Sequence, residues 1–164
     1  MSSSVNEMLR AFYVEYRQQL YTYAVSITHH RETAEDAIQQ AFQQLLCRDR
    51  LSADLRPYVF RCVRNAALDG LRRAKVRAAD SIFEDLAEAN TPSARAPAAL
   101  SVAELNRWLQ MLSPDERETI VLKIYDAFSF QEIADLRGVP LSTTASWYRR
   151  GLAKLRAISA REER

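Results

Sequence analysis

The sequence predicts an all-α protein, made of two small helical domains joined by a flexible linker. Apolar residues recur at three- and four-residue spacing along most of the chain, and only three glycines occur in 164 residues. A stretch rich in acidic residues, proline and alanine interrupts this pattern near the middle. With 48% hydrophobic residues the chain can bury two small cores. We therefore expect a first domain over residues 1–78, a linker over 79–100 and a second domain over 101–164.

Three helices are expected in the first domain. Apolar side chains repeat at helical spacing from about Val5 to His29, which predicts an opening core helix. A second helix over about 33–47 has an apolar stripe on one side and acidic and amide side chains on the other, free for a partner. The third helix starts near residue 55 or 57 and reaches about 77, with aromatic residues between its arginines. This mixture suits an unpaired DNA strand, whose bases stack on aromatic rings, although aromatics at helical spacing are also typical of a core.

Positive charge is concentrated around this third helix. The formal net charge of the chain is only +2, so the total hides the pattern. A local basic cluster of this kind favours a polyanionic partner. Its members are Arg48, Arg50, Arg56, Arg61, Arg64, Arg72, Arg73, Lys75 and Arg77.

Two capping boxes mark the start of the second domain. Helical patterning resumes at Ser101, with Glu104 three residues later. A second helix starts at Ser113, where Pro114 suits the first turn and Glu116 completes another capping box. With the two helices that follow, the second domain should contain about four.

A third capping box opens a helix-turn-helix. Ser129 precedes an apolar helical stripe and is followed three residues later by Glu132. Gly138 tolerates a left-handed backbone, and Pro140 cannot continue a helix because it has no amide proton. The first helix must therefore end there.

The next helix carries the candidate DNA contacts. Ser142, or alternatively Thr143, can cap a helix that runs through Leu155, with Arg149 and Arg150 facing outward to meet phosphates. A plain structural role is the alternative, because helix pairs with a glycine turn are common and basic residues also complement a helix C-terminus.

Residue types elsewhere argue against an enzyme. Cys47 and Cys62 form neither a metal-binding nor a disulfide framework, and His29 and His30 are the only histidines. No glycine-rich phosphate loop, signal peptide or membrane-spanning apolar run is recognisable. We expect a cytoplasmic protein that is not an enzyme, uses no cofactor or metal, has no small-molecule substrate and does not insert into membranes.

The order of these motifs resembles a bacterial extracytoplasmic-function sigma factor, a two-domain member of the main sigma family, over nearly the whole chain. Residues 34–42 are similar to the polymerase-binding segment of that family. Residues 55–73 resemble its promoter-melting helix, and residues 112–140 match the helix-turn-helix that reads the upstream promoter element. The implied function is to bind core RNA polymerase and direct transcription from promoters with minus-ten and minus-thirty-five elements.

This resemblance implies three sets of site residues. The set expected to bind polymerase comprises Glu35, Asp36, Gln39, Gln40 and Phe42. The set expected to recognise and melt the downstream element comprises Arg56, Tyr58, Phe60, Arg61, Arg64, Asn65, Asp69, Arg72 and Arg73. The set expected on the recognition helix comprises Ser142, Thr143, Thr144, Ser146, Trp147, Arg149 and Arg150.

The implied partners are promoter DNA, core RNA polymerase through its clamp helices and flap, and an anti-sigma factor. Two residue roles stay open at this point. Asn65 is either a base reader or a structural hydrogen-bonding residue. The family commonly has basic residues where this chain has Ala145 and Trp147, so Trp147 either packs against its domain or approaches DNA.

Two other functions compete with a sigma factor. A stand-alone helix-turn-helix regulator would leave the motifs of the first domain unexplained. A polymerase-binding adaptor would use the same docking face without melting a promoter. Promoter opening by the holoenzyme therefore distinguishes a sigma factor from an adaptor.

Overall fold

The computed structural model describes residues 2–80 and 102–162, and this part of the chain is helical without strands. The all-α class is confirmed. Ser101, the predicted cap, and most of the predicted linker lie outside the described residues. The elements are α1 (Ser2–Thr28), α2 (Arg31–Leu46), α3 (Leu55–Asp80), α4 (Val102–Gln110), α5 (Pro114–Ile120), the π-helical turn η1 (Val121–Tyr125), α6 (Phe130–Arg137) and α7 (Leu141–Glu162).

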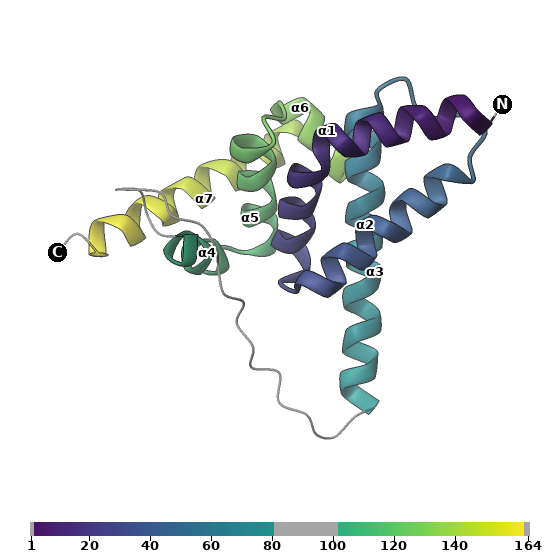
Figure 1. Ribbon diagram of the computed structural model, residues 1–164. Coiled ribbons are helices and arrows are strands. Elements are labelled where there is room, and N and C mark those ends of the chain that lie inside the picture. The colour runs from purple at the N-terminus through teal and green to yellow at the C-terminus, as the bar shows by residue number, and fades with distance from the viewer. Residues whose placement is uncertain (1, 81–101, 163–164) are drawn as a thin grey trace.

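The first three helices pack against one another around a common core (Figure 1). Small residues on α2, namely Ala34, Ala37 and Ala41, are buried and let its backbone approach its neighbours closely. The α1–α2 connection is tight, with His29 in the left-handed region at φ 59°. The expected helices are confirmed with ends shifted by a few residues. Helix α3 runs on to Asp80, past the predicted start of the linker at 79.

Two predicted capping boxes are present in the second domain. At Ser113 the hydroxyl accepts from the Glu116 amide at 3.3 Å and the Ser113 amide donates to the Glu116 carboxylate at 3.1 Å. The Ser129 and Glu132 pair makes the same two bonds at 3.1 and 2.8 Å. These bonds satisfy amide protons that the first turn of a helix leaves free.

The turn of the helix-turn-helix follows its prediction, but the next helix starts earlier than expected. Gly138 is left-handed, at φ 65°, and ends α6. Helix α7 begins at Leu141 rather than after Ser142, because the Pro140 carbonyl already accepts the amide of Thr143 at 3.0 Å. It also continues beyond Leu155 to Glu162.

The two domains share one core, which no pattern in the sequence predicts. The Phe60 ring on α3 lies 5.0 Å from the Phe128 ring of the second domain, and 5.5 Å from the Tyr23 ring on α1, between ring centroids. Helix α3 also contacts α6, and α1 contacts α5 and η1, so α4 to α7 lie against one side of the first domain (Figure 1). The two domains are therefore closed on each other.

Within the described ranges, no helix combines the length and apolar character needed to cross a membrane. The same residues hold no group of three or more potential metal ligands.

Candidate functional site

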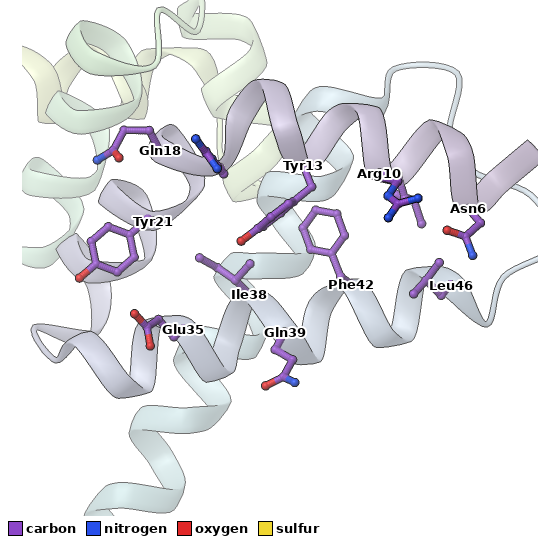
Figure 2. A pocket seen from close by; sticks show the side chains of 12 residues that line it. Asn6, Arg10, Tyr13, Gln18, Tyr21, Glu35, Ile38, Gln39, Phe42 and Leu46 are labelled. Carbon is purple, nitrogen blue, oxygen red and sulfur yellow. The ribbon is translucent and has the colours of Figure 1, made fainter.

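An open groove runs between α1 and α2 (Figure 2). Its volume is about 720 Å³. The Tyr13 and Phe42 rings meet edge to face across it, 5.4 Å apart, and Ile38 lies beside them. Arg10 and Glu35 add charge to its walls. A mainly apolar groove with charged walls can accept an amphipathic helix.

The predicted polymerase set lies along this groove and beside it. Glu35, Asp36 and Gln39 are exposed, whereas Gln40 and Phe42 are half-buried. Three members also line the groove, namely Glu35, Gln39 and Phe42. The opposite side of α2 is buried in the core, so the helix presents one acidic and amide face outward.

Sequence reasoning missed the α1 wall of the groove. Arg10, Tyr13 and Arg17 line it from α1 and are exposed. Tyr13 belongs to the apolar repeat that predicts the opening helix, and only the structure shows that its side chain is 44% exposed. Exposed large apolar side chains that gather in one place mark interaction sites.

The downstream-element set on α3 divides into two groups. In the C-terminal group Asn65, Arg72 and Arg73 are exposed, and Asp69 forms an ion pair with Arg72 at 3.2 Å. This half of α3 extends away from the other helices (Figure 1). Its basic side chains are therefore accessible to a partner.

The N-terminal group of that set is held by the second domain. Arg56 donates to the backbone carbonyl of Asp126, and Arg61 donates to that of Asp135 at 2.5 Å. Arg64 donates to the Glu118 carboxylate at 2.6 Å. These arginines thus contact protein acceptors in the closed chain.

Two aromatic members of the set also lie inward. Phe60 is fully buried between Tyr23 and Phe128, so its proposed role in stacking on a base is corrected to a core role in this arrangement. Tyr58 is half-buried, with the Arg48 guanidinium 5.7 Å from its ring centre. The general rule that an aromatic at helical spacing packs in a core applies to Phe60.

Glu118 is the electrostatic centre of the domain interface. Its carboxylate accepts from the Tyr23 hydroxyl at 2.5 Å and from Arg64, and it lies 3.0 Å from Arg137 Nη1, where the charges attract without an aligned hydrogen bond. Burial and the neighbouring Glu118 charge raise the pKa of Tyr23 well above its usual value. Burial alone lowers the pKa of Arg64, but Glu118 outweighs that effect and the net shift is upward. Tyr23 and Arg64 therefore keep their protons, and Glu118 bridges the domains.

Asp126 and Arg56 form a second contact region. The Arg56 guanidinium lies over the Phe128 ring at 4.0 Å and over the Tyr16 ring at 5.7 Å. Asp126 is buried, and neither oxygen of its carboxylate has a hydrogen-bond partner within the described structure. Burial raises the pKa of Asp126 to about 7, although the charge on Arg56 opposes the shift.

His29 and Arg117 add a third contact between the domains. Arg117 Nη1 lies 2.7 Å from Nε2 of His29, and Arg117 also donates to the carbonyls of Leu109 and Leu112. Burial, helped by the charges on Arg117 and His30, lowers the pKa of His29. A neutral imidazole can accept from Arg117, whereas a protonated one would repel it.

The recognition-helix set lies on α7 with unequal exposure. Ser142, Arg149 and Arg150 are exposed, whereas Thr143, Ser146 and Trp147 are half-buried. Thr144 is fully buried and its hydroxyl has no partner within the described residues, so a base contact from Thr144 is corrected to a packing role.

Trp147 packs against its own domain in this structure. The Arg137 guanidinium lies 4.8 Å from the centre of its ring, and Arg137 also donates to Asp115 at 2.5 Å. The contact joins α6 and α7 through a cation–π interaction. Of the two roles left open for Trp147, the structure therefore supports packing.

Comparison with known proteins finds a family match for each domain. Residues 12–77 match sigma-70 region 2, and residues 103–155 match sigma-70 region 4. The chain is 36% identical over 132 residues to RNA polymerase sigma factor CarQ of Myxococcus xanthus, covering 76% of this chain and 74% of CarQ. It is 26% identical over 147 residues to the ECF RNA polymerase sigma factor SigL of Mycobacterium tuberculosis, covering 85% of this chain and 81% of SigL.

Two solved structures share the fold. The sigma factor RpoE in complex with the anti-sigma factor NepR, from Bartonella quintana, has a TM-score of 0.78 at 21% identity, covering 94% of this chain and 98% of RpoE. CnrH in complex with the cytosolic domain of CnrY has a TM-score of 0.68 at 20% identity, covering 97% of this chain and 92% of CnrH.

A three-helix bundle that matches sigma-70 region 2, followed by a helix-turn-helix domain that matches region 4, is the domain order of a sigma factor. The chain belongs to the sigma-70 family and is an extracytoplasmic-function sigma factor. Proteins of this family bind core RNA polymerase and promoter DNA, and they act in transcription initiation.

Proposed function

We propose that this sigma factor directs polymerase to promoters by recognising a minus-ten element with α3 and a minus-thirty-five element with α7. Such a protein must first dock on polymerase. The observation that carries the proposal is therefore the exposed acidic and amide face of α2, opposite a buried alanine stripe. A stand-alone DNA-binding regulator has no need of that face. Since bacterial polymerase works in the cytoplasm, the protein acts there.

Docking is assigned to the α2 face and the α1–α2 groove. Asp36 is exposed beside the groove, and Phe42 and Tyr13 supply its apolar floor. The occupant is the clamp-helix segment of the largest polymerase subunit, while the second domain engages the flap. An apolar centre gives affinity, and the charges around it set orientation and partner choice.

Replacing Asp36→Arg should abolish capture of the chain by purified core polymerase and leave its helical circular dichroism unchanged. Glu15→Arg is the matched control, because Glu15 is also an exposed acidic residue but belongs to α1, whereas Asp36 lies on the outward face of α2. Equal loss of capture in both variants would show that the effect comes from the change in net charge and not from the α2 face. Normal capture of the Asp36 variant would remove the docking assignment.

Promoter opening is assigned to the exposed half of α3. Arg72 and Arg73 hold the strand through its phosphates, and the exposed Asn65 amide is the candidate base reader. Extruding a base costs a few kcal/mol, so stacking and pocket contacts must offset that cost.

Asn65→Ala should reduce open-complex formation by the holoenzyme without reducing capture by polymerase. Permanganate reactivity of unpaired thymines measures the opening. Capture without any opening by the parent chain would favour an adaptor.

Upstream recognition is assigned to the exposed residues of α7. Ser142 lies in the first turn of α7, and Arg149 and Arg150 are exposed farther along it.

Replacing both Arg149 and Arg150 by alanine should weaken duplex binding. The slope of log affinity against log salt concentration should fall in magnitude by about two, one for each lost phosphate contact. Binding titrations at several salt concentrations measure the slope, and an unchanged slope would reject the assignment.

A protein antagonist is the third proposed partner. The structural neighbours RpoE and CnrH were solved with the anti-sigma factor NepR and with the cytosolic domain of CnrY. We propose that an anti-sigma factor restrains this chain in the same general way. Affinity purification of the tagged chain from its native cell, before and after stress, tests for such a partner.

A further inference from the structure

Helix α7 packs against α5 and α6, and two contacts tie one of its sides to α5 (Figure 1). At the first contact the centre of the Trp147 ring lies 4.8 Å from the Arg137 guanidinium, and Arg137 in turn donates to Asp115 of α5 at 2.5 Å. At the second, the Lys154 ammonium group donates to both carboxylate oxygens of Glu116 at 2.8 and 3.0 Å. Trp147 and Lys154 are about two helical turns apart, so they share one side of α7.

A different side of α7 carries the proposed DNA contacts. Ser142, Ser146 and Arg149 follow one another at spacings of four and three residues, so they form one stripe along the helix. Ser142 and Arg149 are exposed, and Ser146 is half-buried. Because the two contacts hold one side of the helix, they also determine the direction in which the stripe points.

We infer that Arg137 and Trp147 form a clamp that orients the recognition helix, and that discrimination between upstream DNA sequences depends on this clamp. The inference rests on the proposed role of α7 in reading the upstream element. The Arg137 side chain is only 5% exposed, so it is not a phosphate contact in spite of its charge. Arg137 is a positioning residue, which acts on α7 through the ring of Trp147.

Ion pairs with α5 keep the Arg137 guanidinium in place. Its Nη2 atom donates to Asp115, and its Nη1 atom lies 3.0 Å from a carboxylate oxygen of Glu118. A guanidinium over an aromatic ring is attracted to the ring electrons, and the attraction is larger where water is excluded. A rotation of α7 about its axis would move the Trp147 ring away from a cation that stays bound to α5. The clamp therefore opposes such a rotation.

Two simpler roles for Trp147 lead to different expectations. A tryptophan that touched DNA itself would not need Arg137. A tryptophan that only stabilised the domain would change binding to all sequences in the same proportion, through the fraction of folded protein. The ratio of affinities for a preferred and a scrambled upstream element therefore distinguishes orientation of the helix from simple stabilisation.

The test uses holoenzyme assembled from core polymerase and the full chain. Selection from promoters randomised at the upstream element gives the sequence that the parent prefers, and affinities are then measured for that sequence and for a scrambled one. Trp147→Leu removes the ring, whereas Trp147→Phe keeps an aromatic face. Trp108→Leu is the matched control, because Trp108 is buried in the same domain but bonds to Glu162 at the far end of α7.

Trp147→Leu is expected to lower the affinity ratio on the order of ten-fold, the size of one lost base contact. Trp147→Phe should keep most of the ratio, and Trp108→Leu should leave it at the parent value. An unchanged ratio in Trp147→Leu, or an equal fall in Trp108→Leu, would overturn the inference. A loss in Trp147→Phe as large as that in Trp147→Leu would also overturn it, since the cation needs only an aromatic face.

Arg137→Lys examines the other half of the clamp. It keeps the positive charge beside the α5 carboxylates but removes the planar guanidinium, so it should lower the ratio as Trp147→Leu does. The double variant should lose no more than either single variant, because the same contact is lost in each. Additive losses, or normal discrimination in Arg137→Lys, would overturn the clamp and favour direct contact of Trp147 with DNA. If Trp147→Leu does not fold, judged by circular dichroism, Arg137→Lys decides alone.

The outcomes separate this inference from the proposed function. If the parent holoenzyme selects no upstream sequence, the assignment of upstream recognition to α7 is wrong, and the clamp is rejected with it. If the parent selects a sequence and the Arg137 and Trp147 variants prefer it equally strongly, only the clamp is rejected. A preference that weakens in Trp147→Leu and in Arg137→Lys, and persists in Trp147→Phe, supports both.

Discussion

Asp126 shows how far a single residue can depart from its behaviour in water. It is 2% exposed, its carboxylate has no hydrogen-bond partner within the described structure, and burial raises its pKa to about 7. An ionised carboxylate in such a place costs free energy, and the Arg56 charge offsets only part of that cost.

Asp126→Asn is expected to flatten the pH dependence of stability. The carboxyl ionises near pH 3.8 when unfolded but near 7 when folded, so the folded state binds more protons between those values. The free energy of unfolding of the parent chain should therefore fall by a few kcal/mol as the pH rises through that window, and stay low above it. Urea unfolding at several pH values measures the slope. Asp54→Asn, at an exposed site, should keep the parent slope.

Thr144 gives a second prediction at this scale. Its hydroxyl is buried without a partner, so Thr144→Val should leave the free energy of unfolding unchanged or raise it by about 1 kcal/mol. Duplex binding by α7 should not change, whereas Ser142→Ala, at an exposed site, should weaken it. Loss of binding by the Thr144 variant alone would restore Thr144 to the base-reading set. Urea unfolding and duplex titration provide the two measurements.

At the scale of elements, local sequence signals set the ends of the helices. Ser113 and Ser129 cap α5 and α6 through reciprocal bonds with a glutamate three residues later. Gly138 then ends α6 in a left-handed conformation that other residues rarely adopt. Together they set where α5 and α6 begin and where α6 ends.

Gly138→Ala should lower the free energy of unfolding by about 1 kcal/mol, because alanine at a positive φ is strained. No atom lies within 4 Å of the added methyl carbon, so backbone strain is the only cause. Gly138→Asn should lose less, since asparagine tolerates this conformation better. Equal losses for alanine and asparagine in urea unfolding would point to a different cause.

For the whole molecule, the shared core couples domains that the sequence predicts as separate. Phe60 connects Tyr23 on α1 with Phe128 in the second domain, and Glu118 connects Tyr23 with Arg64. Both tryptophans, Trp108 and Trp147, belong to the second domain. Their fluorescence therefore reports on one domain, whereas circular dichroism reports on all the helices.

We expect the urea transitions followed by tryptophan fluorescence and by circular dichroism to coincide, because a continuous core unfolds as one unit. Phe60→Ala removes the aromatic link, so its two transitions should separate. Ile38→Ala is the control, since Ile38 is buried within the first domain. Separate transitions in the parent chain would show that the domains close too weakly to share stability.

The sequence by itself determined the helices, their caps and the family. Periodicity and the reciprocal serine and glutamate pairs depend on neighbours a few residues apart, so they can be recognised without knowledge of the tertiary structure. The exposed face of α2 followed from the same periodicity. The turn at Gly138 and Pro140 was equally local.

Only the tertiary structure decided which site residues are available. Phe60 and Thr144 carry chemistry suited to DNA but are fully buried, and Arg56, Arg61 and Arg64 are held by the second domain. These contacts join residues 54 to 74 positions apart, and no periodicity within one helix encodes such a pairing. The groove between α1 and α2 likewise arises from two faces meeting. Burial and charge pairing at long range are properties of the packed molecule, and they decide what each side chain can bind.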